Sequence, residues 1–147
     1  MRLILRQSPL GQEATYRILV DQIPPPAEPG VVHIVLRLSI PVFAQPATRA
    51  APHVLFHIER SDGKLYLVGV NDGNSHDVIR DIVLTTTDGK KFNQEKGSSP
   101  YILAGTTRRW PIAANAPDPL PADNTFQLTA HSTGAAIAQQ VSVSAQP

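Results

Sequence analysis

The chain has 147 residues, a formal net charge of +1 and no cysteine. The near-neutral charge gives no electrostatic reason to expect a nucleic acid or an anionic membrane as partner, and without cysteine neither disulfides nor thiolate metal sites can form. No apolar run approaches the ~20 residues of a membrane-spanning helix, so membrane insertion is not expected. The 14 prolines and nine glycines are typical of short strands joined by turns, and we expect an all-β fold.

The first 46 residues are predicted to hold three strands. Arg2–Arg6 is a short apolar run, Thr15–Ile23 leads into a proline-rich loop, and Gly30–Pro46 is the longest candidate strand. Three strands are too few for a stable sandwich, because one face of each would lack a partner sheet. We therefore expect this region to be a partial domain.

The long strand carries an unbroken apolar row when it is read with a period of two. The row consists of Val32, Ile34, Leu36, Leu38, Ile40 and Val42. Side chains of a strand alternate between its two faces, so one face of this strand is wholly apolar. Pro41 cannot donate a ladder hydrogen bond, which places the strand at a sheet edge for part of its length. Long apolar edges invite aggregation unless a strand covers them, so pairing with a guest strand is one interpretation.

A second module is predicted to follow a hinge that is bracketed by prolines, at residues 47–52. Two strands flank Ser61–Gly63, whose Asp-Gly dipeptide is a strong hairpin signal. The later elements are a strand at 78–84, a turn at 87–89, strand pieces at 100–103 and 109–112, a proline-rich loop at 113–124 and a final hairpin of strands at 125–130 and 136–144. This spacing predicts a complete β-sandwich over residues 53–147.

Candidate metal and catalytic groups are few. His53 and His57 are four residues apart, as metal ligands on a helix are, but on a strand they lie roughly 13 Å apart. The segment Asn71–Asp77 has oxygen ligands at turn spacing without the terminal glutamate of a calcium loop, so a turn is the favoured interpretation. Ser39 and Ser132 lack a nucleophile-elbow pattern. We expect a protein that is not an enzyme and that has no metal and no cofactor.

Three segments, in order along the chain, resemble the periplasmic pilus-assembly chaperones of the usher pathway. The long strand ends in Ile40-x-x-Phe43-x-x-Pro46, the pattern that closes the last strand of the first domain in that family. The run Ala14–Pro26 is similar to the strand before it, which closes on Ile-Pro, and Tyr101–Trp110 is similar to a second-domain strand. The resemblance is closest to the archaic, Csu-like branch and covers nearly the whole chain.

The resemblance implies two immunoglobulin-like β-sandwich domains, with a partial first domain at 1–46, the hinge at 47–52 and a complete second domain at 53–147. The sequence corresponds to the family from about the fifth strand of the first domain. The apolar run at Met1–Arg6 is too short for a signal peptide. We therefore expect an N-terminally truncated form of a chaperone that binds pilin subunits in the periplasm and delivers them to an outer-membrane usher, in pilus assembly and cell wall organization.

Members of that family lend an edge strand to a pilin, which is a sandwich that lacks its last strand. The residues at the matching donor positions are Val32, Ile34, Leu36 and Leu38. The alternative is that this apolar row faces the core of its own module; the resemblance favours donation. An uncovered donor strand also predicts self-association of the chain.

The family also binds the pilin's terminal carboxylate with basic side chains, because a buried carboxylate needs charge-assisted hydrogen bonds. Pro41 stands where the family usually has a lysine, and the arginine of the family's first strand has no counterpart here. The remaining anchor candidates are Arg17, which we favour, and Arg37. The alternative for Arg17 is a surface arginine in a solvated row with Asp21.

Gln22 and Gln45 match positions where the family often has an acid and an arginine that form an interdomain salt bridge. Two amides can hydrogen-bond without charge, which predicts a looser hinge; the alternative is that both face water. Trp110 is predicted to lie in the second core, and Arg108 and Arg109 to be strand-end charges available to an usher. A rival function is a stand-alone adhesion or carbohydrate-binding module, which would need aromatic residues along a shallow groove, and aromatics make up only 5% of the chain.

Overall fold

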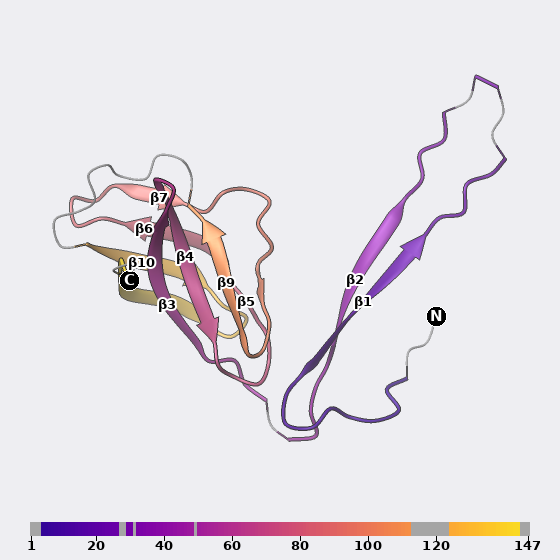
Figure 1. Cartoon of the computed structure of the whole chain (residues 1–147), viewed down its shortest axis with the longest axis horizontal. Helices are drawn as coiled ribbons and strands as arrows, with labels where there is room; N and C mark the ends of the chain where they lie inside the picture. The colour runs from indigo at the N-terminus through magenta and orange to yellow at the C-terminus, as the bar shows by residue number, and fades with distance from the viewer. Residues whose placement is uncertain (1–3, 27–28, 31, 49, 113–123, 145–147) are drawn as a thin grey trace. The chain divides into compact units, whose positions relative to one another are not determined.

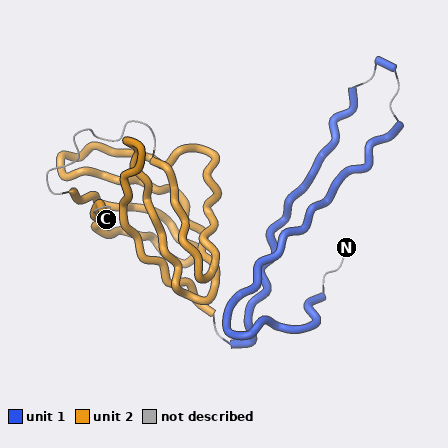
Figure 2. Tube along the Cα trace, viewed as in Figure 1, with its two compact units in different colours: residues 1–49 blue, residues 50–147 orange. Residues whose placement is uncertain are grey.

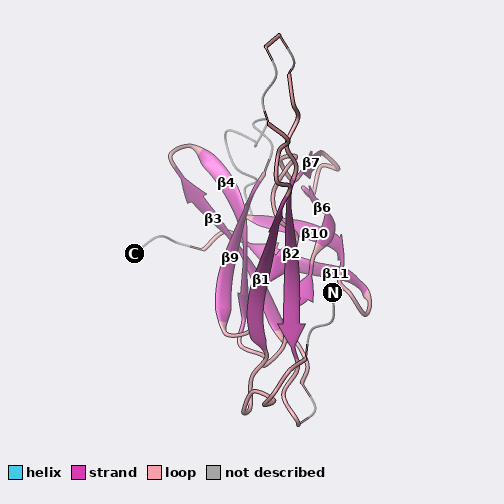
Figure 3. Ribbon diagram, turned by 90° about the vertical axis from the view of Figure 1, so that its right-hand side faces the viewer, coloured by secondary structure: helices cyan, strands magenta, loops and turns pink. Residues whose placement is uncertain are grey.

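The computed structural model describes residues 4–26, 29–30, 32–48, 50–112 and 124–144. Every regular element in these ranges is a β-strand, so the described chain is all-β (Figure 1, Figure 3). The chain divides into two compact units, Met1–Arg49 and Ala50–Pro147, which are called unit 1 and unit 2 below (Figure 2). The division falls within the segment 47–52 that the sequence marks as a hinge.

Unit 1 contains a two-stranded antiparallel ribbon (Figure 1). Its strands are β1 (Ala14–Asp21) and β2 (Arg37–Ala44), paired so that Ala14 lies opposite Ala44 and Asp21 lies opposite Arg37. The β-branched and aliphatic residues that dominate both segments suit a pleated surface. The strand predicted at Thr15–Ile23 is confirmed with slightly earlier bounds.

Two expectations for unit 1 are wrong. Ile4–Arg6 has no strand structure, and the rest of the predicted strand Arg2–Arg6 lies outside the described residues. The long strand is also shorter than predicted, because β2 begins only at Arg37 and the segment 32–36 precedes it. By continuation of the register, residues 32–34 of this segment lie opposite Pro24–Pro26, and prolines have no N–H with which to extend the ladder.

Unit 2 is a β-sandwich of two main sheets. One sheet has the order β3-β4-β9, and the other has the order β11-β10-β6-β7. The strands of the first sheet are β3 (Val54–Ser61), β4 (Lys64–Asn71) and β9 (Thr106–Pro111). Those of the second are β6 (Arg80–Thr85), β7 (Lys91–Asn93), β10 (Thr125–His131) and β11 (Ala136–Ser142). The short strands β5 (Asp77–Val78) and β8 (Tyr101–Ile102) pair with each other.

The predicted hairpins of unit 2 are confirmed. Ser61 pairs with Lys64 across Asp62 and Gly63, whose φ values of 51° and 73° are those that a tight two-residue turn requires. The turn predicted at residues 87–89 is closed by the N–H of Thr86, which donates to the carbonyl of Lys90 at 2.9 Å. β10 and β11 form the final hairpin.

The strand predicted at residues 78–84 is interrupted at Ile79. Val78 pairs with Tyr101, whereas Arg80 pairs with His131 of a different sheet, so the chain changes partner at Ile79. Strand β7 was not predicted, because a strand of three residues is too short to show an alternating pattern. Most of the predicted proline-rich loop, residues 113–123, lies outside the described residues.

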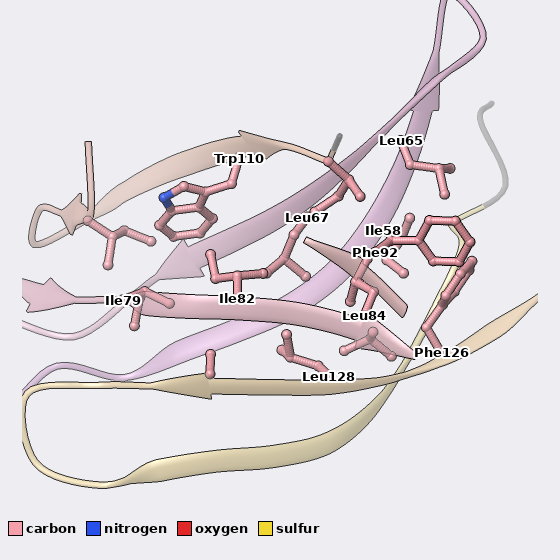
Figure 4. Close-up of a cluster of buried hydrophobic side chains, with 14 residues drawn as sticks. Ile58, Leu65, Leu67, Ile79, Ile82, Leu84, Phe92, Trp110, Phe126 and Leu128 are labelled. Atoms are coloured by element: carbon pink, nitrogen blue, oxygen red, sulfur yellow. The ribbon is translucent and has the colours of Figure 1, made fainter. Parts of the chain in front are cut away.

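The core of unit 2 lies between its two main sheets (Figure 4). Ile58, Leu67 and Trp110 reach it from the first sheet, and Leu84 and Phe126 from the second, all fully buried. Trp110 is thus confirmed as a core residue, and its indole N–H donates to the carbonyl of Ser99 at 3.1 Å. A buried indole needs such a partner for its N–H.

The two main sheets of unit 2 also touch along both edges. Ile58 of β3 forms a bridge with Val143, and Gln94 forms one with Ile112. These bridges shield strand edges that would otherwise offer unpaired backbone groups to other chains. In unit 1 no such bridge is found along the outer edge of β2 in the described residues.

Candidate functional site

The register of the ribbon tells which backbone groups of β2 face away from β1. The N–H of Gln22 donates to the carbonyl of Leu36 at 3.0 Å, which makes these two residues a hydrogen-bonded pair. Opposite pairs in an antiparallel ladder alternate between hydrogen-bonded and non-hydrogen-bonded. Leu38, Ile40 and Val42 therefore bond back to β1, and the odd-numbered residues of β2 direct their backbone groups to the outer edge. In the described residues no further strand pairs along that edge.

One face of the ribbon is apolar and uncharged. Cross-strand partners share a face, so the even-numbered residues of both strands lie together. They are Tyr16, Ile18, Val20, Leu38, Ile40 and Val42. We call this set the apolar face; within it, Tyr16, Val20, Leu38 and Ile40 remain exposed. A two-stranded ribbon has no second layer with which to bury such a face.

The predicted donor residues continue this face toward the loop. Val32, Ile34, Leu36 and Leu38 are 90%, 82%, 62% and 56% exposed. Only Leu38 lies within β2, whereas the other three precede the strand. The backbone N–H of Leu36 donates to the side-chain oxygen of Gln22 at 3.3 Å, which marks the end of the ladder. Their exposure leaves these side chains available to a partner, and their donor role stays a prediction.

The opposite face of the ribbon carries the charges. Arg37 and Asp21 lie opposite each other and form a two-pronged ion pair, with Nε to Oδ1 at 2.5 Å and Nη2 to Oδ2 at 3.0 Å. The hydrogen bond to Asp21 raises the pKa of Arg37 above its ordinary value. Both side chains are mostly exposed, so this pair contributes little to stability. The ion pair does, however, engage the guanidinium of Arg37, which is the second candidate for binding the pilin's terminal carboxylate.

Arg17, the favoured anchor candidate, lies on the same charged face. Its Nη1 donates to the hydroxyl of Ser39 at 2.8 Å, and its cross-strand partner is Pro41. Arg17 and Asp21 are both exposed on this face, as the alternative of a solvated row expects, and the carboxylate of Asp21 pairs with Arg37. A guanidinium has five N–H donors, so the bond to Ser39 leaves capacity for an anionic ligand.

Gln22 and Gln45 lie at opposite ends of the ribbon, so their amides do not pair; both residues are exposed, as the alternative expects. Gln22 follows β1 and lies opposite Leu36, whereas Gln45 follows β2. At about 3.3 Å per residue, nine positions of register separate them by roughly 30 Å. The side-chain oxygen of Gln22 accepts instead from the backbone of Leu36.

A hollow marks the place where the ladder of the ribbon ends. Its volume is about 260 Å³, and it is lined by Asp21, Gln22, Val35, Leu36 and Arg37. The two arms continue side by side beyond it toward the loop (Figure 1). Here the chain changes from a hydrogen-bonded ribbon to arms that are free of the ladder.

The segment Asn71–Asp77 of unit 2 is a structural latch, as the turn interpretation predicts. Asn71 Oδ1 accepts from the backbone N–H groups of His53 and Gly73, and its Nδ2 donates to the carbonyls of Ser75 and Leu103. This buried amide thus uses its oxygen and its nitrogen within the fold. In the described residues no group of three or more histidine, aspartate or glutamate side chains is arranged to hold a metal ion.

The outer face of β3-β4-β9 holds a charged cluster that the sequence did not predict. Glu59 contacts both Arg109 Nε at 3.1 Å and His57 Nε2 at 3.2 Å. The Arg109 guanidinium also lies over the Tyr66 ring, 4.4 Å from its centre. These residues lie on three different strands and are brought together only by the register of those strands, so no sequence motif predicts the cluster. Arg109 is a strand residue within this cluster rather than a strand-end charge.

A shallow depression of about 430 Å³ lies over β6 and β7. The residues that line it include Asp81, Glu95 and Lys96. Asp81 Oδ2 lies 3.2 Å from Nδ1 of His131. The mixed charge of this open surface gives no basis for assigning a reaction.

No protein-family model and no curated protein sequence matches the chain. In the described residues the structure contains no helix that could cross a membrane.

Proposed function

We propose that the chain is a non-enzymatic chaperone that lends the outer edge of unit 1 to an incomplete β-sandwich. The observation that carries the proposal is the exposed, uncharged row Val32, Ile34, Leu36 and Leu38 beside an edge with no strand partner in the described residues. The resemblance to usher-pathway chaperones identifies the guest as a pilin subunit that lacks its last strand. On this view both units are immunoglobulin-like, and the site of action is the periplasm, where pilins are passed to an outer-membrane usher.

The proposed mechanism combines two interactions along one strand. Main-chain hydrogen bonds to the outer edge of β2 would hold the guest strand, and the alternating side chains would fill the groove in the guest's core. Fully burying one aliphatic side chain contributes about 1.5–3 kcal/mol. Four donor residues therefore supply several kcal/mol before the cost of ordering the segment 32–36 is subtracted.

Arg17 is the proposed anchor for the guest's terminal carboxylate. By register it lies opposite Pro41, the position at which the resembled family has its lysine. Cross-strand partners in non-hydrogen-bonded pairs approach closely, so the backbone of Arg17 lies beside that position, and its side chain bonds to Ser39 on the same face. Arg37 is the weaker candidate because Asp21 already binds it through two hydrogen bonds.

The rival function, a carbohydrate-binding module, would require aromatic faces open to a sugar. The Tyr66 ring is covered by Arg109, and Trp110 is fully buried. Tyr16 is exposed but shares the apolar face with aliphatic neighbours. This arrangement favours a strand partner over a sugar.

The test compares two leucines of equal exposure on opposite faces of the ribbon. Leu38 lies on the apolar face and Leu19 on the charged face, and both are 56% exposed. The full chain is mixed with each of a panel of usher-pathway pilin subunits expressed without a chaperone, and complex formation is measured by size exclusion and calorimetry. We expect Leu38→Ser to weaken binding about tenfold or more, from the loss of an apolar side chain.

The matched control is Leu19→Ser, which we expect to leave pilin binding unchanged. Equal losses for the two variants would show that general apolar contact, and not donation from one face, accounts for binding. If no pilin in the panel forms a complex with the chain, the proposed function is contradicted.

A further inference from the structure

Pro41 lies at an outward-facing position of β2. It pairs with Arg17, in a register where odd-numbered residues direct their backbone groups away from β1. Proline has no N–H, so a strand that runs along the outer edge finds donors at Arg37 and Ser39 and loses the next one. A proline at such a position ends or interrupts a ladder.

We propose that Pro41 ends the guest's ladder and thereby determines which apolar residues of this chain are donated. The proposal rests on the proposed function and adds to it the register in which the guest binds. The occupant is the open edge of an incomplete β-sandwich, and the last main-chain N–H that it uses on this edge is that of Ser39.

The exposure of the row agrees with a boundary at Pro41. On its N-terminal side lie the four most exposed residues of the row, Val32, Ile34, Leu36 and Leu38. Ile40, the last residue of the row before Pro41, is 43% exposed, and Val42, beyond Pro41, is half-buried. Because Ser39 is the last donor before Pro41, the guest receives the side chains that precede Ser39, namely Val32, Ile34, Leu36 and Leu38, whereas Ile40 and Val42 lie beyond its last hydrogen-bond donor.

A stop is needed because alternation alone leaves the register open. A slip of one residue would turn every guest side chain to the wrong face, but a slip of two residues restores the same alternation. In this uncharged row no side chain distinguishes the two registers by charge. The missing donor at Pro41 does distinguish them, because a guest strand shifted past it would leave a carbonyl without a partner.

The experiment measures amide hydrogen exchange by NMR in the full isotopically labelled chain, with and without a probe strand. The probe is a synthetic peptide of about ten alternating valine and threonine residues with a lysine at each end. Sedimentation is used to choose a chain concentration at which the chain is monomeric. In the unmodified chain we expect the amides of Arg37 and Ser39 to exchange about tenfold more slowly with the peptide present, and the amide of Phe43 to be unchanged.

The decisive variant is Pro41→Ala, which restores a donor at position 41. We expect the protection to extend to the new amide at position 41 and on to Phe43. Slow exchange at Leu38 and Ile40 without peptide shows that the ribbon is intact in the variant. Pro25→Ala, in the exposed loop, is the matched control and should behave like the unmodified chain.

The outcomes separate the two proposals. The inference is supported if the peptide protects the amides of Arg37 and Ser39 in both forms, and if protection extends past position 41 in Pro41→Ala but not in the unmodified chain. Protection that already reaches Phe43 in the unmodified chain, or that still stops at Ser39 in Pro41→Ala, overturns the inference and leaves edge pairing standing. No protection of Arg37 or Ser39 in any form contradicts strand donation itself, and the role of Pro41 with it.

Discussion

Single residues decide what the charged face of the ribbon can bind. Arg37 is held by Asp21 through two hydrogen bonds, and Arg17 is held by one hydrogen bond to a neutral hydroxyl. Exchanging a hydroxyl partner for a carboxylate strengthens a guanidinium's hydrogen bond, whereas Arg37 already has a carboxylate. The two arginines therefore differ in availability although both are exposed.

We predict that Arg17→Ala weakens capture of a pilin that ends in a free carboxylate by about tenfold, the loss expected for a charge-assisted hydrogen bond. The same substitution should matter much less when the pilin terminus is amidated, because the amide carries no charge. A pull-down that compares both forms of the chain with both forms of the pilin measures the difference.

Arg17→Lys serves as the control, since it keeps the positive charge and should retain part of the preference for the free carboxylate. Equal losses with the free and the amidated pilin would remove Arg17 from the anchor role.

At the scale of elements, the latch Asn71–Asp77 positions the segment through which the chain enters unit 2. The N–H of Ala51 donates to Asn74 Oδ1 at 2.8 Å, and the N–H of Asn74 donates to the carbonyl of Ala51 at 3.1 Å. Gly73 allows the two segments to approach this closely. A Cβ at Gly73 would lie 2.4 Å from His53 N and 2.6 Å from the carbonyl oxygen of Ala51.

We predict that Gly73→Ala destabilises unit 2 by about 1–3 kcal/mol, since a backbone segment cannot yield as a flexible side chain would. The chain's single tryptophan, Trp110, is fully buried in unit 2, so its fluorescence follows the unfolding of this unit in urea.

The matched control is Gly134→Ala, because a Cβ at Gly134 would meet nothing within 4 Å. Its midpoint should stay close to that of the unmodified chain. If Gly73→Ala unfolds at the same urea concentration as the unmodified chain, the latch can rearrange without loss of stability.

At the scale of the whole molecule, the two units differ in how much of their apolar surface they bury. Unit 2 encloses a core between two sheets, and one backbone bridge joins the sheets at each edge. Unit 1 has a single ribbon and leaves several large apolar residues exposed, among them Ile34 and Leu38. An isolated two-stranded ribbon is marginally stable in water, whereas a packed sandwich unfolds cooperatively.

We predict that limited trypsin digestion of the full chain removes unit 1 first and leaves a resistant fragment that begins near Ala50. Local opening exposes the ribbon's arginines to protease at low free-energy cost, whereas cleavage in the strands of unit 2 requires the sandwich to open. Mass spectrometry of the fragments, with Trp110 fluorescence as a measure of folding, tests this.

A chain that resists digestion as one monomeric unit would show that unit 1 has a stability which its ribbon does not explain. Protection that appears only at high chain concentration would instead show that copies of the chain cover the exposed strand, as the predicted self-association requires.

Several features could be predicted because their causes are local. Asp62 and Gly63 adopt the positive φ values of a tight turn whatever lies around them, and the alternation of Phe126, Leu128 and Ala130 places all three on the buried face of β10. The apolar row of the ribbon could also be predicted from the sequence, because adjacent side chains of a strand point to opposite faces.

Other features were decided only by which segments pair. The sequence shows an unbroken row through Val32, but the prolines opposite it end the ladder at Gln22 and Leu36. The interruption at Ile79 and the separation of Gln22 from Gln45 likewise follow from pairing partners that are distant in the chain.

Pro41 shows the difference most directly. The sequence by itself determines that this residue has no N–H to donate. Only the register determines that the missing N–H faces the open edge of β2 and not β1, because a shift of one residue would exchange the two. Composition and alternation thus determine what each side chain and backbone group can do, whereas the long-range pairing of strands decides toward which partner it does so.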